Sequence, residues 1–287
     1  MELAFDVFPP PGDREQNVPP VILLHGMMDS RKTWKRIGPQ IARKTGRKVY
    51  AVDARNHGES PWSDDFNFDI LAEDLDHFLN CHQIPRATLV GHSMGGRAAL
   101  TFALRKPEKV EKLIVEDMTP QNFSVRSSGI VIQMLYLLKE SLNAIPRGAD
   151  ETTAKKAVVD FMVKLLPPEQ IPVGKRDNYD LDMLPLKRVG DKYSWKTNLS
   201  VLESFLNSAE RMHQDLSGTF MGEALFLYGT KSFFKVGKDQ LIPKLFPEAV
   251  KIGFDGAGHL IHHECPDSFV EEVTKFINGY YNQKSKY

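Results

Sequence analysis

The residues Gly91-His92-Ser93-Met94-Gly95 form the pattern G-x-S-x-G between an apolar run that ends at Val90 and a helical pattern that starts at Gly96. This pattern is typical of a nucleophile elbow, in which a strand turns directly into a helix and exposes the serine. The two glycines remove side chains that would collide in so tight a turn. The following helix directs its N-terminal N–H groups toward any oxyanion formed there. Ser93 is therefore the predicted nucleophile, in preference to an incidental serine in a glycine-rich turn.

A serine hydroxyl is a poor nucleophile at neutral pH and needs a base within hydrogen-bond reach. The candidate is His259, in the segment Asp255-Gly256-Ala257-Gly258-His259 directly after the last predicted strand. Other histidines have simpler interpretations: His25 and His57 lie in turns, where they are expected to brace loops. His262 and His263 follow too closely and are expected to begin the next helix. We therefore predict that His259 is the base.

The acid that orients the base is harder to place. In this kind of fold the carboxylate usually follows the strand that here ends at Gly229, but the expected position is occupied by Ser232. Asp239 lies further on and is expected inside the next helix, and Asp255 is typical of a turn. Asp117 follows the strand after the elbow helix, so a parallel sheet would bring it to the same edge as Ser93. Asp117 is the predicted acid, with Ser232 as its hydrogen-bond partner, and Asp239 is the alternative.

Stabilisation of an oxyanion also needs two N–H donors. The residue after the nucleophile, Met94, would supply one, and Met27, after His25-Gly26, would supply the other. Because both would act through the backbone, their side chains could line an apolar acyl pocket together with Phe123, Met134 and Leu137. The same five residues are equally consistent with ordinary core packing.

Short apolar runs and helical patterns alternate over much of the chain. The runs at 21–24, 49–52, 87–90 and 110–115 predict buried strands, and those at 224–229 and 250–254 continue the series. Helices are expected between them, at 33–44 and 238–245 among others. This order predicts an α/β fold with a mostly parallel sheet, helices on both faces and a short edge strand at 3–8.

The alternation stops after Pro120. Helical spacing continues near 130–138, 157–165 and 199–212, and no convincing strand appears before residue 223. This segment is too apolar for a disordered linker. We therefore predict a core formed by residues 1–120 and 223–287, and an all-helical cap or lid formed by residues 121–222 over the carboxyl edge of the sheet.

The bulk composition excludes several classes of protein. The 287 residues carry 37 basic and 37 acidic side chains, so nothing favours nucleic acid or an anionic membrane as a partner. Cys81 and Cys265 do not form a disulfide framework, as expected of a reducing compartment. No apolar run approaches the length of a membrane span, and the first residues resemble neither a signal nor a transit peptide. The residues as given predict a cytoplasmic protein.

The motifs together resemble the α/β-hydrolase fold, over about residues 20–118 and 223–279. The elbow and the segment Val52-Asp53-Ala54-Arg55-Asn56-His57-Gly58 are similar to the branch that holds the alpha/beta-hydrolase-domain protein eleven group and small bacterial esterases. The resemblance implies a serine esterase or lipase of acylglycerols and simple esters that needs no cofactor or metal, with animal members often mitochondrial. Bacterial relatives use the aspartate at the position of Asp117 and a serine at that of Ser232. Animal members can place the acid in the insertion, where this chain has Ser200.

Three activities follow from these predictions. The first is ester hydrolysis through an acyl-enzyme on Ser93, with a small-molecule or lipid ester as substrate. Thioester hydrolysis by the same residues is the second, whereas serine at position 93 argues against dehalogenases and epoxide hydrolases, which use aspartate there. The third is a non-catalytic ligand-binding protein of this fold. Substrate chain length and oligomeric state have no signature in the sequence.

Overall fold

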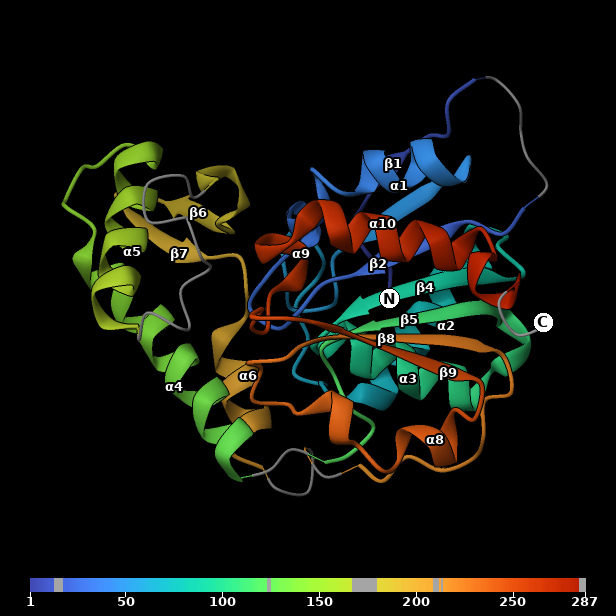
Figure 1. Ribbon diagram of the computed structural model, residues 1–287. Helices are drawn as coiled ribbons and strands as arrows, with labels where there is room; N and C mark the ends of the chain where they lie inside the picture. The colour runs from blue at the N-terminus through green and yellow to red at the C-terminus, as the bar shows by residue number, and fades with distance from the viewer. Residues whose placement is uncertain (13–17, 123–124, 167–179, 209–211, 213, 284–287) are drawn as a thin grey trace.

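The computed structural model describes residues 1–12, 18–122, 125–166, 180–208, 212 and 214–283 (Figure 1). The strands are β1 (Phe5–Phe8), β2 (Val21–Leu24), β3 (Val49–Val52), β4 (Ala87–His92), β5 (Val110–Glu116), β6 (Leu186–Val189), β7 (Lys192–Trp195), β8 (Glu223–Gly229) and β9 (Ala249–Phe254). The α-helices are α1 (Gly38–Thr45), α2 (Phe68–Cys81), α3 (Met94–Arg105), α4 (Val125–Ser141), α5 (Glu151–Leu165), α6 (Leu199–Leu206), α8 (Ile242–Leu245), α9 (Ile261–Glu264) and α10 (Pro266–Ile277).

Seven strands of the described residues form one sheet in the order β1-β3-β2-β4-β5-β8-β9. All neighbours run parallel except β1, which pairs with β3 in the antiparallel direction at the edge. The central strands β3 and β4 are buried along their whole length, as expected when helices cover both faces of a parallel sheet. The predicted fold class, a mostly parallel α/β-hydrolase sheet, is confirmed.

The helices form a layer on each face of the sheet (Figure 1). On one face α2 and α3 bury Leu75, Phe78 and Phe102 in a core with Leu89 and Phe226. On the other face α1 and α10 form the second core cluster around Trp34. Because both faces are covered, the carboxyl ends of the strands are the part of the sheet where a site can form. None of the helices within the described ranges combines the length and the apolar character needed to cross a membrane.

The elements from α4 to α6 lie beyond the carboxyl ends of the strands (Figure 1). Asn198, just before α6, donates its backbone N–H to the carbonyl of Asn56 in the loop after β3 (2.8 Å). In the same region Trp62 donates its indole N–H to the carbonyl of Lys196 (3.1 Å). The segment is thus attached to the loops that surround the site. That it serves as a cap or lid over this edge stays a prediction.

The expectation that residues 121–222 are all helical is wrong. Strands β6 and β7 pair as an antiparallel hairpin, joined by the two-residue loop Gly190-Asp191. Gly190 has φ +65°, a conformation that glycine adopts without strain and that a two-residue hairpin loop requires. The indole N–H of Trp195 bonds the carbonyl of Leu138 (2.8 Å), so the hairpin packs on α4. The Gly-Asp pair between short segments containing valine, tyrosine and tryptophan was the available signal.

Three helices are shorter than predicted. The helix expected at 33–44 is divided into a 3-10 turn at Arg31–Trp34 and α1, because Pro39 stands at the first turn of α1. The helix expected at 238–245 is only the four-residue α8, which Pro243 begins in the same way. Helix α6 ends at Leu206, whereas residues 209–211 of the predicted helix lie outside the described residues.

Candidate active site

Ser93 lies between β4 and α3 in a conformation that side chains rarely adopt, with φ +51° and ψ −113°. A Cβ at Gly91 would overlap the backbone of Gly95, and a Cβ at Gly95 would overlap the carbonyl of Leu24. Both glycines are therefore required for the turn, as the sequence pattern predicts. Such backbone strain at a non-glycine residue is concentrated at functional sites in proteins.

Asp117 directly follows β5 and is fully buried, again with a positive φ of +48°. Its carboxylate accepts hydrogen bonds from the hydroxyl of Ser232 and from the backbone N–H of Gly229 (3.2 Å). The third donor is Nδ1–H of His259, 2.7 Å from Oδ2 of Asp117. These donors compensate for the loss of water around the carboxylate. The structure therefore brings together Asp117, Ser232 and His259, the acid, its hydrogen-bond partner and the base that the sequence predicts.

The alternative acids lie elsewhere. Oδ1 of Asp239 accepts the backbone N–H groups of Leu241 and Ile242 at the start of α8 (2.6 and 3.2 Å). Asp255 accepts a hydrogen bond from the hydroxyl of Thr230 (3.2 Å), as expected of a turn residue. Among the described residues, Asp117 is the only carboxylate that bonds the imidazole of His259.

The loop that carries His259 is held by side chains on both sides. The carboxylate of Glu264 accepts the N–H groups of Gly258 (2.9 Å) and Leu260 (3.2 Å), the two neighbours of His259. The Nε2–H of His92 donates to the carbonyl of His259 (3.1 Å). Burial lowers the pKa of His92, so this ring is neutral and keeps Nδ1 unprotonated when Nε2 donates. The loop is thus fixed at three consecutive residues.

The imidazole of His259 packs at tilted angles among other rings next to the elbow. Its centroid is 4.7 Å from that of His92, the residue before Ser93, and 4.9 Å from that of Phe234. Within the part of the chain that the structure describes, no hydrogen bond joins the Ser93 hydroxyl to the imidazole. Such bonds are often long in free enzymes and shorten when substrate binds. The direct contact between Ser93 and His259 therefore stays a prediction.

Two buried histidines shape the loop that carries Met27. His25 accepts the N–H of Ala54 through Nε2 (3.0 Å), and His57 accepts the N–H of Met28 in the same way (3.3 Å). Burial lowers the pKa of His57 to about 3, so the ring is neutral and can accept. Both histidines brace loops, as expected from their positions in turns.

The proposed oxyanion donors point to no protein acceptor. Over the described residues, neither the N–H of Met27 nor that of Met94 makes a hydrogen bond to another protein group. Met94 is the first residue of α3, where an N–H has no partner within its own helix. Both amides are therefore available to an oxygen atom of a bound substrate.

Sequence analysis missed the braces of this site. It gave no role to His92, which stands at a variable position of the G-x-S-x-G pattern, or to Glu264. It also missed Glu116, a fully buried carboxylate that accepts both the backbone N–H and the Nδ1–H of His262 (2.9 and 2.8 Å). Burial raises the pKa of Glu116 above its usual range. The one available signal for Glu116 was a charged residue at the end of an otherwise apolar strand.

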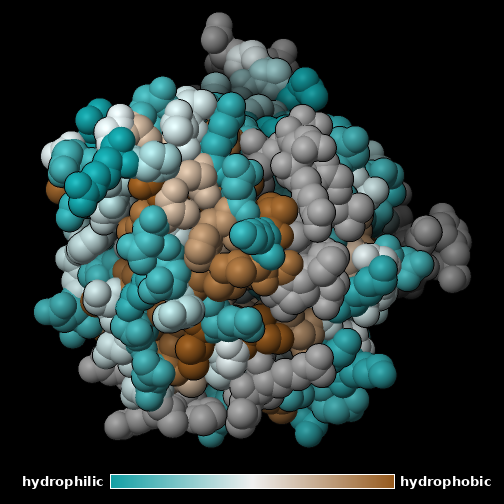
Figure 2. Space-filling model, turned by 90° about the vertical axis from the view of Figure 1, so that its left-hand side faces the viewer, coloured by the Kyte–Doolittle hydropathy of each residue, from teal (hydrophilic) through white to brown (hydrophobic). Residues whose placement is uncertain are grey.

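An apolar wall lies beside Ser93. Met94 is buried in a cluster with Leu135 of α4 and Phe205 of α6, and Met27 packs against the same cluster. Met134 and Leu137 also belong to α4, whereas Phe123 lies outside the described residues. Viewed from the side of this segment, apolar residues gather near the middle of the face (Figure 2). The residue that follows Ser93 is therefore part of an apolar cluster that joins the elbow to α4 and α6.

Replacing Gly229 by alanine is expected to lower kcat/KM about 100-fold, because a Cβ there would overlap the carbonyls of Ala257 and Gly258 and push the His259 loop outward. A displacement of about 1 Å in a catalytic group costs about that much. Steady-state kinetics on a soluble ester would measure the effect. Gly129→Ala is the matched control, since the space around Gly129 is open; unchanged activity of Gly229→Ala would contradict the role given to this contact.

The chain is similar to known proteins over most of its length. A sequence profile described as alpha/beta hydrolase fold matches residues 19–266. The sn-1-specific diacylglycerol lipase ABHD11 of Danio rerio is 32% identical over 281 residues, which are 96% of this chain and 83% of that protein. The protein of the same name from Mus musculus is 30% identical, over 92% of this chain and 83% of its own length. The solved structure of a marine microorganism esterase superposes with a TM-score of 0.77 at 28% identity, covering 96% of this chain and 99% of that chain.

Proposed function

The chain belongs to the alpha/beta hydrolase fold family, and we propose that, as a carboxylic ester hydrolase, it cleaves acylglycerols or simple acyl esters through an acyl-enzyme on Ser93. The observation that carries this proposal is the pair formed by Asp117 and His259 (2.7 Å) at the rim where the strained Ser93 lies. The resemblance found in the motifs and the relatives found over the whole chain support the same class of activity.

In the proposed first step, Nε2 of His259 takes the proton of the Ser93 hydroxyl while the oxygen attacks the ester carbonyl. Asp117 accepts Nδ1–H and stabilises the imidazolium that forms. The carbonyl oxygen becomes an oxyanion between the N–H groups of Met27 and Met94. Each such donor contributes about 2.7–4 kcal/mol to transition-state stabilisation. His259 then gives its proton to the leaving alcohol, which departs from the tetrahedral carbon.

In the second step, water attacks the acyl-enzyme. His259 takes a proton from the water, a second oxyanion forms on the same two amides, and the Ser93 oxygen leaves with the proton that His259 returns. The products are a carboxylic acid and an alcohol. All proton transfers are made by side chains of this chain, so the proposed reaction requires no metal ion or organic cofactor.

The apolar wall next to Ser93 supports a fatty acyl group as the part of the substrate that is recognised. Met27 and Met94 supply flexible, polarisable side chains that adapt to chains of different shape. The Danio rerio and Mus musculus relatives are named as diacylglycerol lipases, which supports an acylglycerol as the substrate of this chain. We propose an acylglycerol or a short- or medium-chain acyl ester.

A panel of esters tests the substrate class. We expect the purified protein to hydrolyse p-nitrophenyl esters and a dispersed diacylglycerol, with kcat/KM changing systematically as the acyl chain lengthens. Product acids would be quantified by chromatography and compared with those from acyl thioesters of the same chains. Faster turnover of the thioesters would identify a thioesterase of the same fold. No turnover of any member, with saturable binding of the same compounds, would identify a ligand-binding protein instead.

A further inference from the structure

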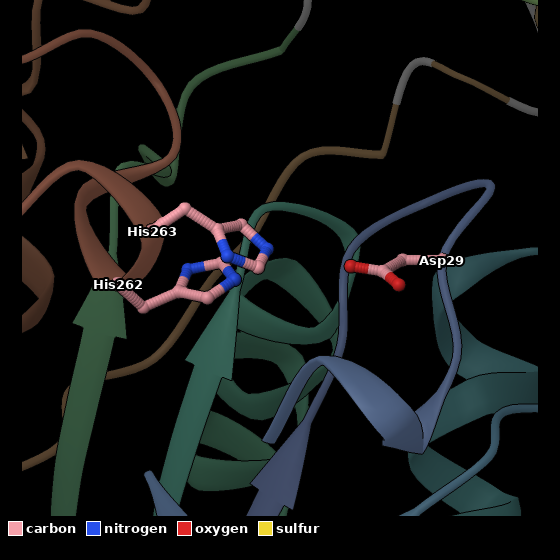
Figure 3. Close-up of side chains that lie close together, drawn as sticks. All are labelled: Asp29, His262 and His263. Carbon is pink, nitrogen blue, oxygen red and sulfur yellow. The ribbon is translucent and has the colours of Figure 1, made fainter. Parts of the chain in front are cut away.

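Asp29, His262 and His263 lie close together, and His262 is three residues after His259 in the chain (Figure 3). Asp29 belongs to the loop after β2, and both histidines belong to α9. In Figure 3 the two imidazole rings and the carboxylate face the space between these two elements. One ligand atom from each residue lies within 4.8 Å of the others. None of these three residues has a role in the proposed hydrolysis.

The histidine rings converge on one point. Nε2 of His262 and Nε2 of His263 each lie 3.0 Å from the hydroxyl oxygen of Thr33, and the ring centroids are 4.2 Å apart. A hydroxyl has a single proton and can donate to only one of these nitrogens at a time. The same hydroxyl can accept from the other nitrogen, so both rings are hydrogen-bonded to Thr33. A metal ion bound here would replace these hydrogen bonds and use the same two nitrogens, which already converge on one point.

The carboxylate of Glu116 fixes the orientation of His262. Both oxygens of Glu116 lie within 2.9 Å of Nδ1 of His262, so Nδ1 carries the proton that is shared with the carboxylate. The other nitrogen, Nε2, is thereby the acceptor on the side of Thr33, whose hydroxyl oxygen lies 3.0 Å away. Histidines that bind metal ions almost always donate their second N–H to a carboxylate or carbonyl in this manner.

We propose that Asp29, His262 and His263 bind a divalent transition-metal ion of the zinc type. Two imidazoles and one carboxylate suit Zn²⁺ and Co²⁺ rather than Mg²⁺ or Ca²⁺, which prefer oxygen ligands. Zinc bonds of about 2.0–2.1 Å place tetrahedral ligand atoms about 3.3 Å apart, which rotation of partly exposed side chains can achieve. Asp29 and His263 are partly exposed, so the ion can enter from solvent; water would complete the coordination.

The ion would join two parts of the active site. Asp29 is two residues after Met27, whose N–H is the proposed oxyanion donor, and His262 is three residues after His259. Binding would therefore fix the position of the loop that carries Met27 relative to His259. The ion itself would contribute no group to the reaction. Because an ion that binds the folded state stabilises it, saturation with Zn²⁺ should raise the Tm by at least about 3 °C.

Metal titration of tag-free protein, first treated with a chelator, tests this proposal. We expect calorimetry with Zn²⁺ to show one ion per chain, and Co²⁺ to produce visible absorption bands and to quench Trp34, whose ring centroid is 4.8 Å from that of His262. The variants His263→Ala and Asp29→Asn should each bind at least about tenfold more weakly. His263→Gln serves as a second variant if His263→Ala does not fold.

His77→Ala is the matched control, because His77 and Cys81 are a pair of metal-binding side chains outside the proposed site, with Nε2 and Sγ 3.4 Å apart on α2. This variant should bind Zn²⁺ as the unmodified protein does. The proposal is overturned if no saturable binding occurs, if His263→Ala binds as tightly as the unmodified protein, or if His77→Ala abolishes binding. Each outcome is independent of ester turnover, which is tested separately.

Discussion

Replacing Ser93 by alanine is expected to lower kcat for ester hydrolysis by about 10⁶-fold, because no other hydroxyl stands on the elbow between β4 and α3. KM should change much less, since the apolar wall around Met94 and the two proposed oxyanion amides stay in place. Residual activity about 10³–10⁴-fold above the uncatalysed rate is expected from these remaining groups. Stopped and continuous assays on the same ester would measure both constants.

Covalent labelling provides the second readout of this prediction. A fluorophosphonate should modify the unmodified protein at Ser93, as identified by peptide mass spectrometry, and should leave Ser93→Ala unlabelled. Ser232→Ala is the control, because it removes a nearby hydroxyl that bonds Asp117 but keeps the nucleophile. Label on a residue other than Ser93, or none on the unmodified protein, would refute the acyl-enzyme.

The second large effect is expected for Asp117→Asn, which should lower kcat about 10⁴-fold. The amide is the same size as the carboxylate, so Gly229 and Ser232 can keep their positions. Its NH₂ group, however, can present a donor to Nδ1 of His259, which favours the tautomer that has its proton on Nε2. In that tautomer Nε2 cannot accept the proton of Ser93. Folding should be monitored by circular dichroism in parallel.

Asp239→Asn is the matched control for this experiment. Oδ1 of Asp239 accepts two N–H groups at the start of α8, and asparagine keeps an oxygen able to accept them. Turnover should therefore stay within about twofold of the unmodified protein. A large loss in Asp239→Asn together with an active Asp117→Asn would assign the acid to Asp239. Ser232→Ala should cost only about tenfold, the effect of one hydrogen bond to a charged group.

The sequence was most informative where function restricts local backbone conformation. The elbow could be found because a strand-to-helix turn needs glycines at fixed positions, and Gly91 and Gly95 both occupy places where a Cβ would overlap backbone atoms. The alternation of buried strands and helices was equally clear, because a parallel sheet covered on both faces produces continuous apolar runs. These local rules predicted the fold class, which is confirmed, and Ser93 and His259 as candidates.

Contacts between distant segments followed no such local rule. Residues 186–195 form a hairpin that helical spacing did not predict, because its strands are short and it is stabilised by packing of Trp195 on α4. The backbone around His259 is held by hydrogen bonds to Glu264 of α9 and His92 of the elbow. Nothing in the types or spacing of these two residues marks them as partners of that backbone.

By itself the sequence determined the class of fold, the strained serine turn and a short set of candidate acids, because each depends on residues that are close along the chain. Only the tertiary structure decided which carboxylate meets the imidazole, since Asp117 and His259 lie on different strand ends and become neighbours when the sheet forms. It also brought Asp29 of the loop after β2 next to His262 and His263 of α9. Hydrogen-bond geometry of this kind depends on ångström distances between segments, which patterns of residue type along the chain do not specify.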